Sequence, residues 1–250
     1  MLNKSKNILI IIFWILIWQV SSMLVNNQLL LASPFLVLQV IAELLTNLSF
    51  YIIIIKSIFN VISGFILATL IGSILAYIGY KNKFIDDLLS PIIIILKSVP
   101  VVSFIILLLV WINNELLPII IGMIMGIPIF YTNIKYGFIN LNNNLNNISK
   151  VFKLTRITKL RYIYLPQLLN HFKASSVLAI GLCFKSAIAA EVIGVINDTI
   201  GDNLYQAKIY LDTPTLFAWT IVIIVLTFCF EKLIISLLKV LNKKVNEVKL

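Results

Sequence analysis

The sequence predicts an all-α, polytopic membrane protein with six transmembrane helices and cytoplasmic N and C termini. Hydrophobic residues make up 60% of its 250 residues and charged residues only 12%, and the mean hydropathy is +1.04. A soluble domain is nearer half apolar and a quarter charged, so this chain has too little polar surface to face water on all sides. Six apolar segments and an uneven distribution of Lys and Arg complete the prediction.

Six segments have the length of a membrane-spanning helix, which needs about 20 mostly apolar residues. They are 8–25, 52–78, 89–112, 116–138, 174–196 and 214–238. The first follows a basic start like that of a signal peptide, but no small-residue cleavage site comes after it, so we expect a retained span. Small residues that favour close helix packing recur in spans two, four and five. They are Gly64, Ala68, Gly72, Gly122, Gly126, Ala187 and Ala190.

The basic residues place both chain ends in the cytoplasm. With this orientation the inside regions carry fourteen Lys or Arg residues and the outside regions carry one, Lys208. The inside regions are 1–7, 79–88, 139–173 and 239–250. The outside regions are 26–51, 113–115 and 197–213. This asymmetry follows the positive-inside rule, so topology explains the net charge of +10 and we expect no nucleic-acid partner.

The largest inside loop contains a basic stretch, 146–167, with apolar residues at regular spacing. Those apolar residues recur every three positions: Val151, Leu154, Ile157, Leu160 and Ile163. That spacing drifts around a helix of 3.6 residues per turn, so two short helices fit better than one. Thr155 is a suitable N-cap for the second helix, and Pro166 limits its continuation. These physical arguments leave two roles open, a helix lying on anionic lipid or an element that docks on another protein.

The end of this stretch resembles the coupling loop of ABC importer permeases. The sequence Ile-Tyr-Leu-Pro at 163–166 matches the isoleucine-x-leucine-proline that ends the loop. Counting back places Asn147, Ile148 and Ser149 on the family's glutamate-alanine-alanine, and Lys153 on its glycine. The upstream half therefore departs from the pattern. Lys153 adopts left-handed backbone angles less readily than the glycine it replaces. Asn147 takes the place of a carboxylate that could contact a basic residue of the ATPase.

Five further stretches resemble the same family, in particular its nitrate/sulfonate/taurine-type permeases. In chain order they are 32–41, 57–76, 96–111, 131–137 and 184–194. The first resembles a Ser-Pro that opens an external interfacial helix, and the second a Ser-x-x-Arg-x-x-x-Gly-Phe segment with Asn60 in place of arginine. The others resemble a segment centred on Pro100, an Asn-x-x-x-Gly signature and a fifth span ending in an alanine-acidic pair. The resemblance covers about 33–240.

This resemblance implies a type I ABC importer permease, multi-pass in the bacterial plasma membrane and not an enzyme. It divides the chain into an N-terminal helix with an external loop (1–32), a permease transmembrane domain (33–240) and a basic cytoplasmic tail (241–250). Two copies would form the pore as a homodimer, an ABC ATPase dimer would dock from the cytoplasm, and a substrate-binding protein would deliver solute from outside. ATP would bind to the ATPase, because this chain has no Gly-rich phosphate loop followed by Lys-Ser or Lys-Thr. We therefore expect no cofactor in this chain.

The resemblance also predicts which residues contact the ATPase. They are Asn147, Ile148, Ser149, Lys153, Leu154, Arg156, Ile157, Leu160, Ile163, Leu165 and Pro166. Closure of the ATPase dimer on ATP has to move a rigid part of the permease, and short helices with an apolar stripe and basic residues suit an acidic groove. In the same family the loop 197–213 would be a short external helix and a candidate contact for the binding protein.

Three residues are candidates for the translocation pathway: Pro100, Lys185 and Glu191. Ionisable side chains inside spans are costly and are functional candidates by default. Lys185 would line the pathway or pair across a dimer, or else be held by carbonyls or snorkel. Glu191 would act at the pathway, or face external water near the end of its span. The two side chains differ by about 240° around one helix, so we expect no direct pair.

A basic pathway would suit an anionic solute such as a sulfonate or nitrate, and a thiamine-precursor-like solute also stays open. Two other transporter classes compete with this reading. A secondary carrier should show duplicated halves, and we find no convincing repeat. The scaffold subunit of a vitamin importer would also dock on ATPases. An intramembrane enzyme would need a Ser/His or acidic/His constellation, which this sequence lacks. Because His171 is the only histidine, we expect neither a catalytic nor a metal site.

Overall fold

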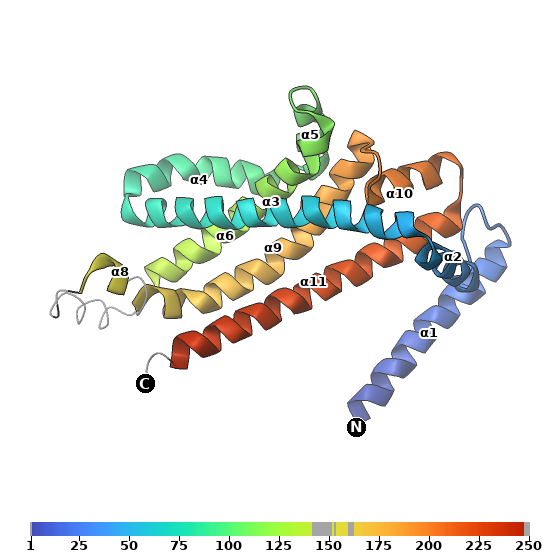
Figure 1. Cartoon of the computed structure of the whole chain (residues 1–250), viewed down its shortest axis with the longest axis horizontal. Coiled ribbons are helices and arrows are strands. Elements are labelled where there is room, and N and C mark those ends of the chain that lie inside the picture. Colours follow the sequence, from blue (N-terminus) through green and yellow to red (C-terminus); the bar gives the residue numbers. More distant parts are fainter. Residues whose placement is uncertain (1, 142–151, 153, 160–162, 248–250) are drawn as a thin grey trace. The chain divides into compact units, whose positions relative to one another are not determined.

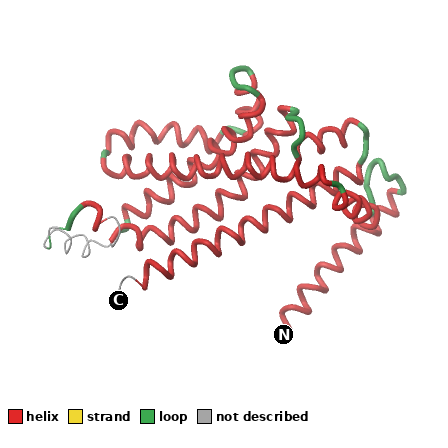
Figure 2. The backbone as a smooth tube through the Cα atoms, viewed as in Figure 1, coloured by secondary structure: helices red, strands yellow, loops and turns green. Residues whose placement is uncertain are grey.

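A computed structural model describes most of the chain as helices joined by short turns (Figures 1 and 2). The described residues are 2–141, 152, 154–159 and 163–247. Within these ranges there is no β-strand, so the all-helical class is confirmed. Packing of the backbone separates two compact units. One contains residues 1–57 and 191–225, and the other contains 58–190 and 226–250.

The helices follow the order of the expected spans. The five longest are α1 Leu2–Val25, α3 Leu48–Lys81, α6 Leu117–Ile139, α9 Leu165–Gly194 and α11 Thr213–Glu247. The shorter ones are α2 Pro34–Thr46, α4 Lys83–Ser98, α5 Val101–Leu109, the 3-10 turn η1 Asn114–Leu116, α8 Arg156–Lys159 and α10 Ile200–Ile209. In the described part of the chain, five helices are long and apolar enough to cross a membrane, or six if α4 and α5 form one broken span. Six crossings with cytoplasmic ends remain a prediction.

The third expected span, 89–112, is not a single helix. α4 ends at Ser98 and α5 begins at Val101, and the two axes differ in direction by 100°. Pro100 explains the break, because proline has no N–H to donate and pushes the preceding residue out of helical geometry. Val99 accordingly has extended angles, φ −77° and ψ 132°. The expectation of one continuous helix was wrong here, whereas Pro91 lies inside α4 without ending it.

The ends of two other spans were also placed too tightly. α9 starts at Leu165 rather than at 174, and α11 continues to Glu247 rather than ending at 238. Hydropathy marks the part of a helix that suits lipid, while its backbone hydrogen bonds can continue through polar residues beyond that part. The polar stretch 170–173 and the residues Lys239, Lys243 and Lys244 therefore belong to helices and not to loops.

The unit of residues 1–57 and 191–225 has a small core around α2. Ser33 caps α2 by accepting a hydrogen bond from the Leu36 amide at 3.4 Å, and Pro34 takes the first helical position. Ala32, Val37 and Ala218 are fully buried in this core, next to the ring of Trp18. The helix expected after Ser-Pro at 33–34 is therefore confirmed, while its external location stays a prediction.

In the unit of residues 58–190 and 226–250, small residues let α3, α6 and α9 approach closely. A Cβ added at Gly64 would lie 2.7 Å from the Ile119 carbonyl, and one at Gly126 would lie 2.6 Å from the Ala68 Cβ. From α9, the buried Cys183 donates its S–H to the Gly122 carbonyl at 3.3 Å. The predicted close packing through small residues is confirmed, as is usual where helices associate without a hydrophobic driving force.

Candidate functional site

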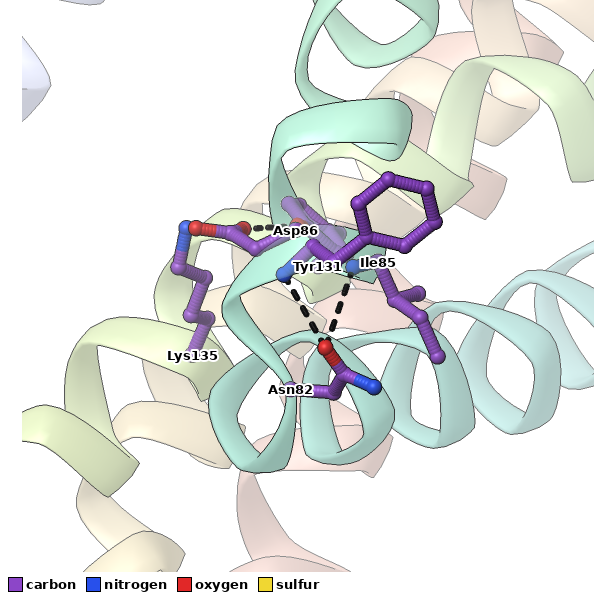
Figure 3. Close-up of polar contacts among 6 residues, drawn as sticks. Asn82, Ile85, Asp86, Tyr131 and Lys135 are labelled. Atoms are coloured by element: carbon purple, nitrogen blue, oxygen red, sulfur yellow. Dashed lines mark hydrogen bonds and ion pairs between the residues drawn. The ribbon is translucent and has the colours of Figure 1, made fainter.

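A polar cluster ties the start of α4 to α6 (Figure 3). The Asn82 side chain caps α4 by accepting hydrogen bonds from two amides of its first turn, at 3.0 and 3.5 Å. One turn further, the Asp86 carboxylate accepts a hydrogen bond from the Tyr131 hydroxyl at 2.5 Å and pairs with the Lys135 ammonium. Gly79 of α3 lies against the same tyrosine, because a Cβ there would be 2.9 Å from its hydroxyl oxygen. The cluster therefore holds three helices together.

A groove of about 280 Å³ lies between α4 and α6 beside this cluster. Its lining is Ser90, Ile93, Ile94, Lys97, Tyr131, Thr132, Lys135, Tyr136 and Ile139. The two ammonium groups differ, because Lys135 is paired with Asp86 while Lys97 is an exposed side chain. The groove thus carries one exposed ammonium, that of Lys97, beside the hydroxyl groups of its otherwise largely apolar lining.

The predicted ATPase-contacting segment is described in part. The Thr155 hydroxyl accepts a hydrogen bond from the Thr158 amide at 3.3 Å, which is the N-cap pattern expected for α8. Leu154 just before this cap is partly exposed. For Arg156 and Ile157 the structure describes only the helical backbone. The other predicted contacts upstream of Ile163 lie outside the described residues: Asn147, Ile148, Ser149, Lys153 and Leu160.

The C-terminal end of this segment is anchored in the core. Ile163 and Tyr164 are each 7% exposed. The Tyr164 ring meets that of Phe138 on α6 edge-to-face, with ring centroids 6.1 Å apart, and the Lys159 ammonium lies 5.4 Å from its centroid. α9 then begins at Leu165, so that Pro166 stands in the first turn, where a missing N–H costs nothing.

The three predicted pathway residues lie in different environments. Pro100 is exposed at the break between α4 and α5, and Lys185 is exposed on α9. Glu191, near the end of α9, is 0% exposed. The alternative in which Glu191 faces external water is therefore wrong for this subunit. A role of these three residues in the pathway stays a prediction.

Glu191 is held by residues from two other helices. Its Oε2 atom accepts hydrogen bonds from the Ser57 hydroxyl of α3 at 2.8 Å and from the Gly201 amide of α10 at 3.2 Å. Ser57 in turn accepts a hydrogen bond from the Ile200 amide at 2.9 Å. Two amides of the first turn of α10 are thus satisfied by this pair of side chains.

Sequence reasoning selected Glu191 but missed its partners. Ser57 lies 134 positions away, and Gly201 lies in a polar loop whose helix gives a weak periodic signal. The one available signal was the position of Ser57 at the start of a stretch that matches the family. Nothing in the sequence alone connects that serine to the glutamate.

The all-helical fold, with five or six apolar spans among the described residues, is that of ABC transporter permeases, as two solved structures show. The solved "amino acid ABC transporter with histidines" has a TM-score of 0.58 at 17% identity, over 77% of this chain and 92% of that one. The MetNI methionine ABC transporter in inward-facing conformations has a TM-score of 0.59 at 14% identity, over 76% and 93%. These likenesses concern the fold alone.

The chain belongs to the family of binding-protein-dependent transport system inner membrane components, whose model matches residues 68–247. The nitrate import permease protein NrtB of Synechococcus elongatus is 27% identical over 131 residues, 52% of this chain and 47% of NrtB. The bicarbonate transport system permease protein CmpB of the same organism is 24% identical over 140 residues, 56% and 50% of the two chains. The matches thus span about half the length of these relatives. The protein is a multi-pass component of the plasma membrane in a non-enzymatic transport family, as the sequence motifs predicted.

Proposed function

We propose that this protein is the permease subunit of an ATP-driven importer for a small anion. The observation that carries the permease role is the continuous family match over residues 68–247. Two facts support an anion as solute. The relatives are named for nitrate and bicarbonate, and the groove between α4 and α6 presents the exposed Lys97 ammonium beside hydroxyl groups. Sulfonates share the same charge and belong to the same class of solute.

Two copies of the chain form the pore, and a substrate-binding protein delivers the anion from outside. Pro100 at the α4–α5 break, the exposed Lys185 and the buried Glu191 contribute to the translocation pathway. A break within a spanning helix supports this assignment of Pro100, because transporter sites are commonly built at discontinuous helices.

An ABC ATPase dimer, which binds the ATP, docks on residues 145–166. Support comes from the described end of that segment. Because Ile163 and Tyr164 are buried against α6 and lead directly into α9, a push on α8 is carried into both helices. Basic residues in the segment suit an acidic groove on the ATPase.

The first test is to purify the protein in mild detergent and identify the proteins that accompany it. We expect an ABC ATPase to copurify with the natural chain and to be lost from the double variant Arg156→Glu, Leu160→Asp. A matched control makes the same chemical changes in the loop expected outside, Lys208→Glu with Leu211→Asp, where both residues are exposed. The control should keep the ATPase. A chain that purifies without any ATPase contradicts the proposal, and so does a double variant that retains it.

The second test reconstitutes the purified complex with its binding protein in vesicles. We expect ATP-dependent uptake of one of three labelled anions, nitrate, bicarbonate or a small sulfonate. Unlabelled anion should compete with this uptake, and a neutral solute of similar size should not. ATP-dependent uptake of neutral solutes alone contradicts an anionic substrate. Copurification of a small membrane-embedded capture subunit in place of a soluble binding protein would instead indicate the scaffold of a vitamin importer.

A further inference from the structure

The buried contact between Glu191 and the first turn of α10 joins residues of three helices. Its members come from α3, α9 and α10, and all lie in the unit of residues 1–57 and 191–225. The Ser57 hydroxyl uses both of its functions, accepting from the Ile200 amide at 2.9 Å and donating to Glu191 at 2.8 Å. The Gly201 amide donates to the same carboxylate oxygen. We propose that Glu191 is a positioning residue that locks α10 to the end of α9 and to Ser57 of α3, so that these contacts are kept during transport.

The burial of this contact makes it costly to break. Glu191 is 0% exposed and Ser57 is 1% exposed. A buried carboxylate is costly unless hydrogen bonds or charges compensate it, and hydrogen bonds to an ionised group are stronger than neutral ones. The amides at the start of α10 also carry the positive end of the helix dipole. Displacing α10 would therefore leave Glu191 buried without these partners, which strongly favours the docked position.

The shape of the contact depends on glycine at position 201. A Cβ there would collide with Glu191 and come within 2.5 Å of the Val192 amide nitrogen. The N-terminus of α10 thus rests directly on the backbone of α9. A second tie comes from α3, where the Lys56 ammonium donates to the Asn197 carbonyl at 2.8 Å.

The connection from α9 to α10 is short and held in an uncommon geometry. Val195 and Asp198 have positive φ angles of 47° and 57°, a region that residues other than glycine seldom adopt. Such conformations persist where surrounding contacts determine them. The Thr199 side chain, fully buried, caps α10 by accepting from the Asp202 amide at 3.1 Å. The connection is therefore built to hold α10 in one position.

This inference rests on the proposed function and on the expectation from the sequence that residues 197–213 lie outside, where the binding protein would contact them. If α10 were only loosely held, contact with the binding protein would displace α10 alone. A locked helix passes the contact on to the residues that hold it, Ser57 of α3 and Glu191 of α9. The lock would thus make α10 a lever for the signal that a solute-loaded binding protein has docked.

The test uses the whole complex in vesicles and compares Ser57→Ala and Gly201→Ala with two matched controls. Ser103→Ala removes an exposed hydroxyl, and Gly181→Ala adds a Cβ on α9 that meets no atom within 4 Å. ATP hydrolysis is measured with and without solute-loaded binding protein. We expect unchanged basal hydrolysis in all four variants, and a stimulation that falls at least threefold in the two lock variants only. Equal loss of basal and stimulated hydrolysis, or full stimulation in the lock variants, overturns the proposal.

Hydrogen exchange separates failure of the lock from failure of the proposed function, because it needs no partner. In the purified chain we expect the amides of 199–209 to exchange at least tenfold faster in Ser57→Ala and Glu191→Gln. Those of 121–134 on α6 should not change. Unchanged exchange in 199–209 overturns the lock even if transport is active. Faster exchange in the two variants, combined with a natural complex that shows no stimulation by loaded binding protein, would instead leave the lock standing and count against the proposed function and the lever.

Discussion

The Tyr131 hydroxyl of α6 and the Lys135 ammonium one turn later both bind the same oxygen of Asp86 on α4. This arrangement fixes α4 against the C-terminal half of α6, the helix that precedes the predicted ATPase-contacting segment. Because Asn82 caps α4 four residues before Asp86, the carboxylate is delivered to α6 by a helix whose start is already fixed. One carboxylate thus satisfies a hydroxyl and an ammonium that are both only partly solvated.

Replacing Asp86 should therefore destabilise the protein more than replacing its neighbour. Asp86→Ala leaves Tyr131 and Lys135 without their shared acceptor, and we expect a loss of about 1–3 kcal/mol in the free energy of unfolding. Asp87→Ala is the matched control, because Asp87 is exposed on the same turn. Thermal unfolding in detergent measures both. Equal melting temperatures for the two variants would show that the cluster adds nothing to stability.

Two glycines on neighbouring helices should respond to alanine with opposite signs. At Gly126 the added Cβ would lie 2.6 Å from the Ala68 Cβ and 3.2 Å from the Cys183 sulfur, so α3 and α9 would have to shift. We expect Gly126→Ala to cost about 1–3 kcal/mol, the range for overpacked sites. Gly181→Ala meets open space, and the helix propensity of alanine should stabilise it slightly. The fraction of folded protein after heating, read by size exclusion, distinguishes them, and a stabilising Gly126→Ala contradicts the close packing.

The sequence predicted those parts of the fold that depend on local or periodic signals. The apolar runs located the long helices, Thr155 acted as the expected cap, and the small residues marked the tight contacts. The 100° break at Pro100 was missed because a proline inside an apolar run is compatible with either a kink or a break. Neighbouring helices decide between them, and a single sequence does not reveal those neighbours.

In the candidate sites, too, the sequence revealed local motifs but not the tertiary neighbours of the residues. The Ile-x-Leu-Pro end at 163–166 was visible as a motif, and its burial against Phe138 follows from tertiary packing. Glu191 was visible as a costly ionisable residue in a span, whereas its partner Ser57 comes from another helix. Hydrogen-bond partners distant in sequence carry no periodic signal. The sequence therefore identified residues that need an explanation, and the structure provided their surroundings.

Lys97 should matter for the affinity of the transporter for its anion. It is the exposed ammonium of the groove between α4 and α6, so removing its charge weakens attraction without breaking a structural pair. For Lys97→Gln we expect KM for the transported anion to rise roughly fivefold, because one partly solvated charge contact contributes on the order of 1 kcal/mol. Lys83→Gln at the exposed start of α4 is the control. Uptake in vesicles with saturating binding protein measures KM, and an unchanged value for Lys97→Gln would exclude the groove from anion binding.

Tyr164 should determine how efficiently ATP hydrolysis is coupled to solute transport. Its ring is 7% exposed and packs against Phe138, and it also meets the Lys159 ammonium of α8, so it connects the predicted ATPase contact to α6. In Tyr164→Ala that connection is lost, while the surface that binds the ATPase remains. We therefore expect ATP hydrolysis to continue and the number of solute molecules moved per ATP to fall, roughly threefold for a loss near 0.7 kcal/mol in the coupled step.

The control for this experiment is Phe152→Ala, which removes another aromatic ring from the same loop. Phe152 is 72% exposed, so it has little packing to lose within the subunit. Uptake and hydrolysis are measured in the same vesicles, so that their ratio does not depend on the amount of active complex. If the ratio falls equally in both variants, aromatic contacts with the ATPase rather than the anchoring of Tyr164 control coupling. If it falls only in Tyr164→Ala, the buried end of the segment is the part that transmits force, because it is the part that α6 and α9 hold in place.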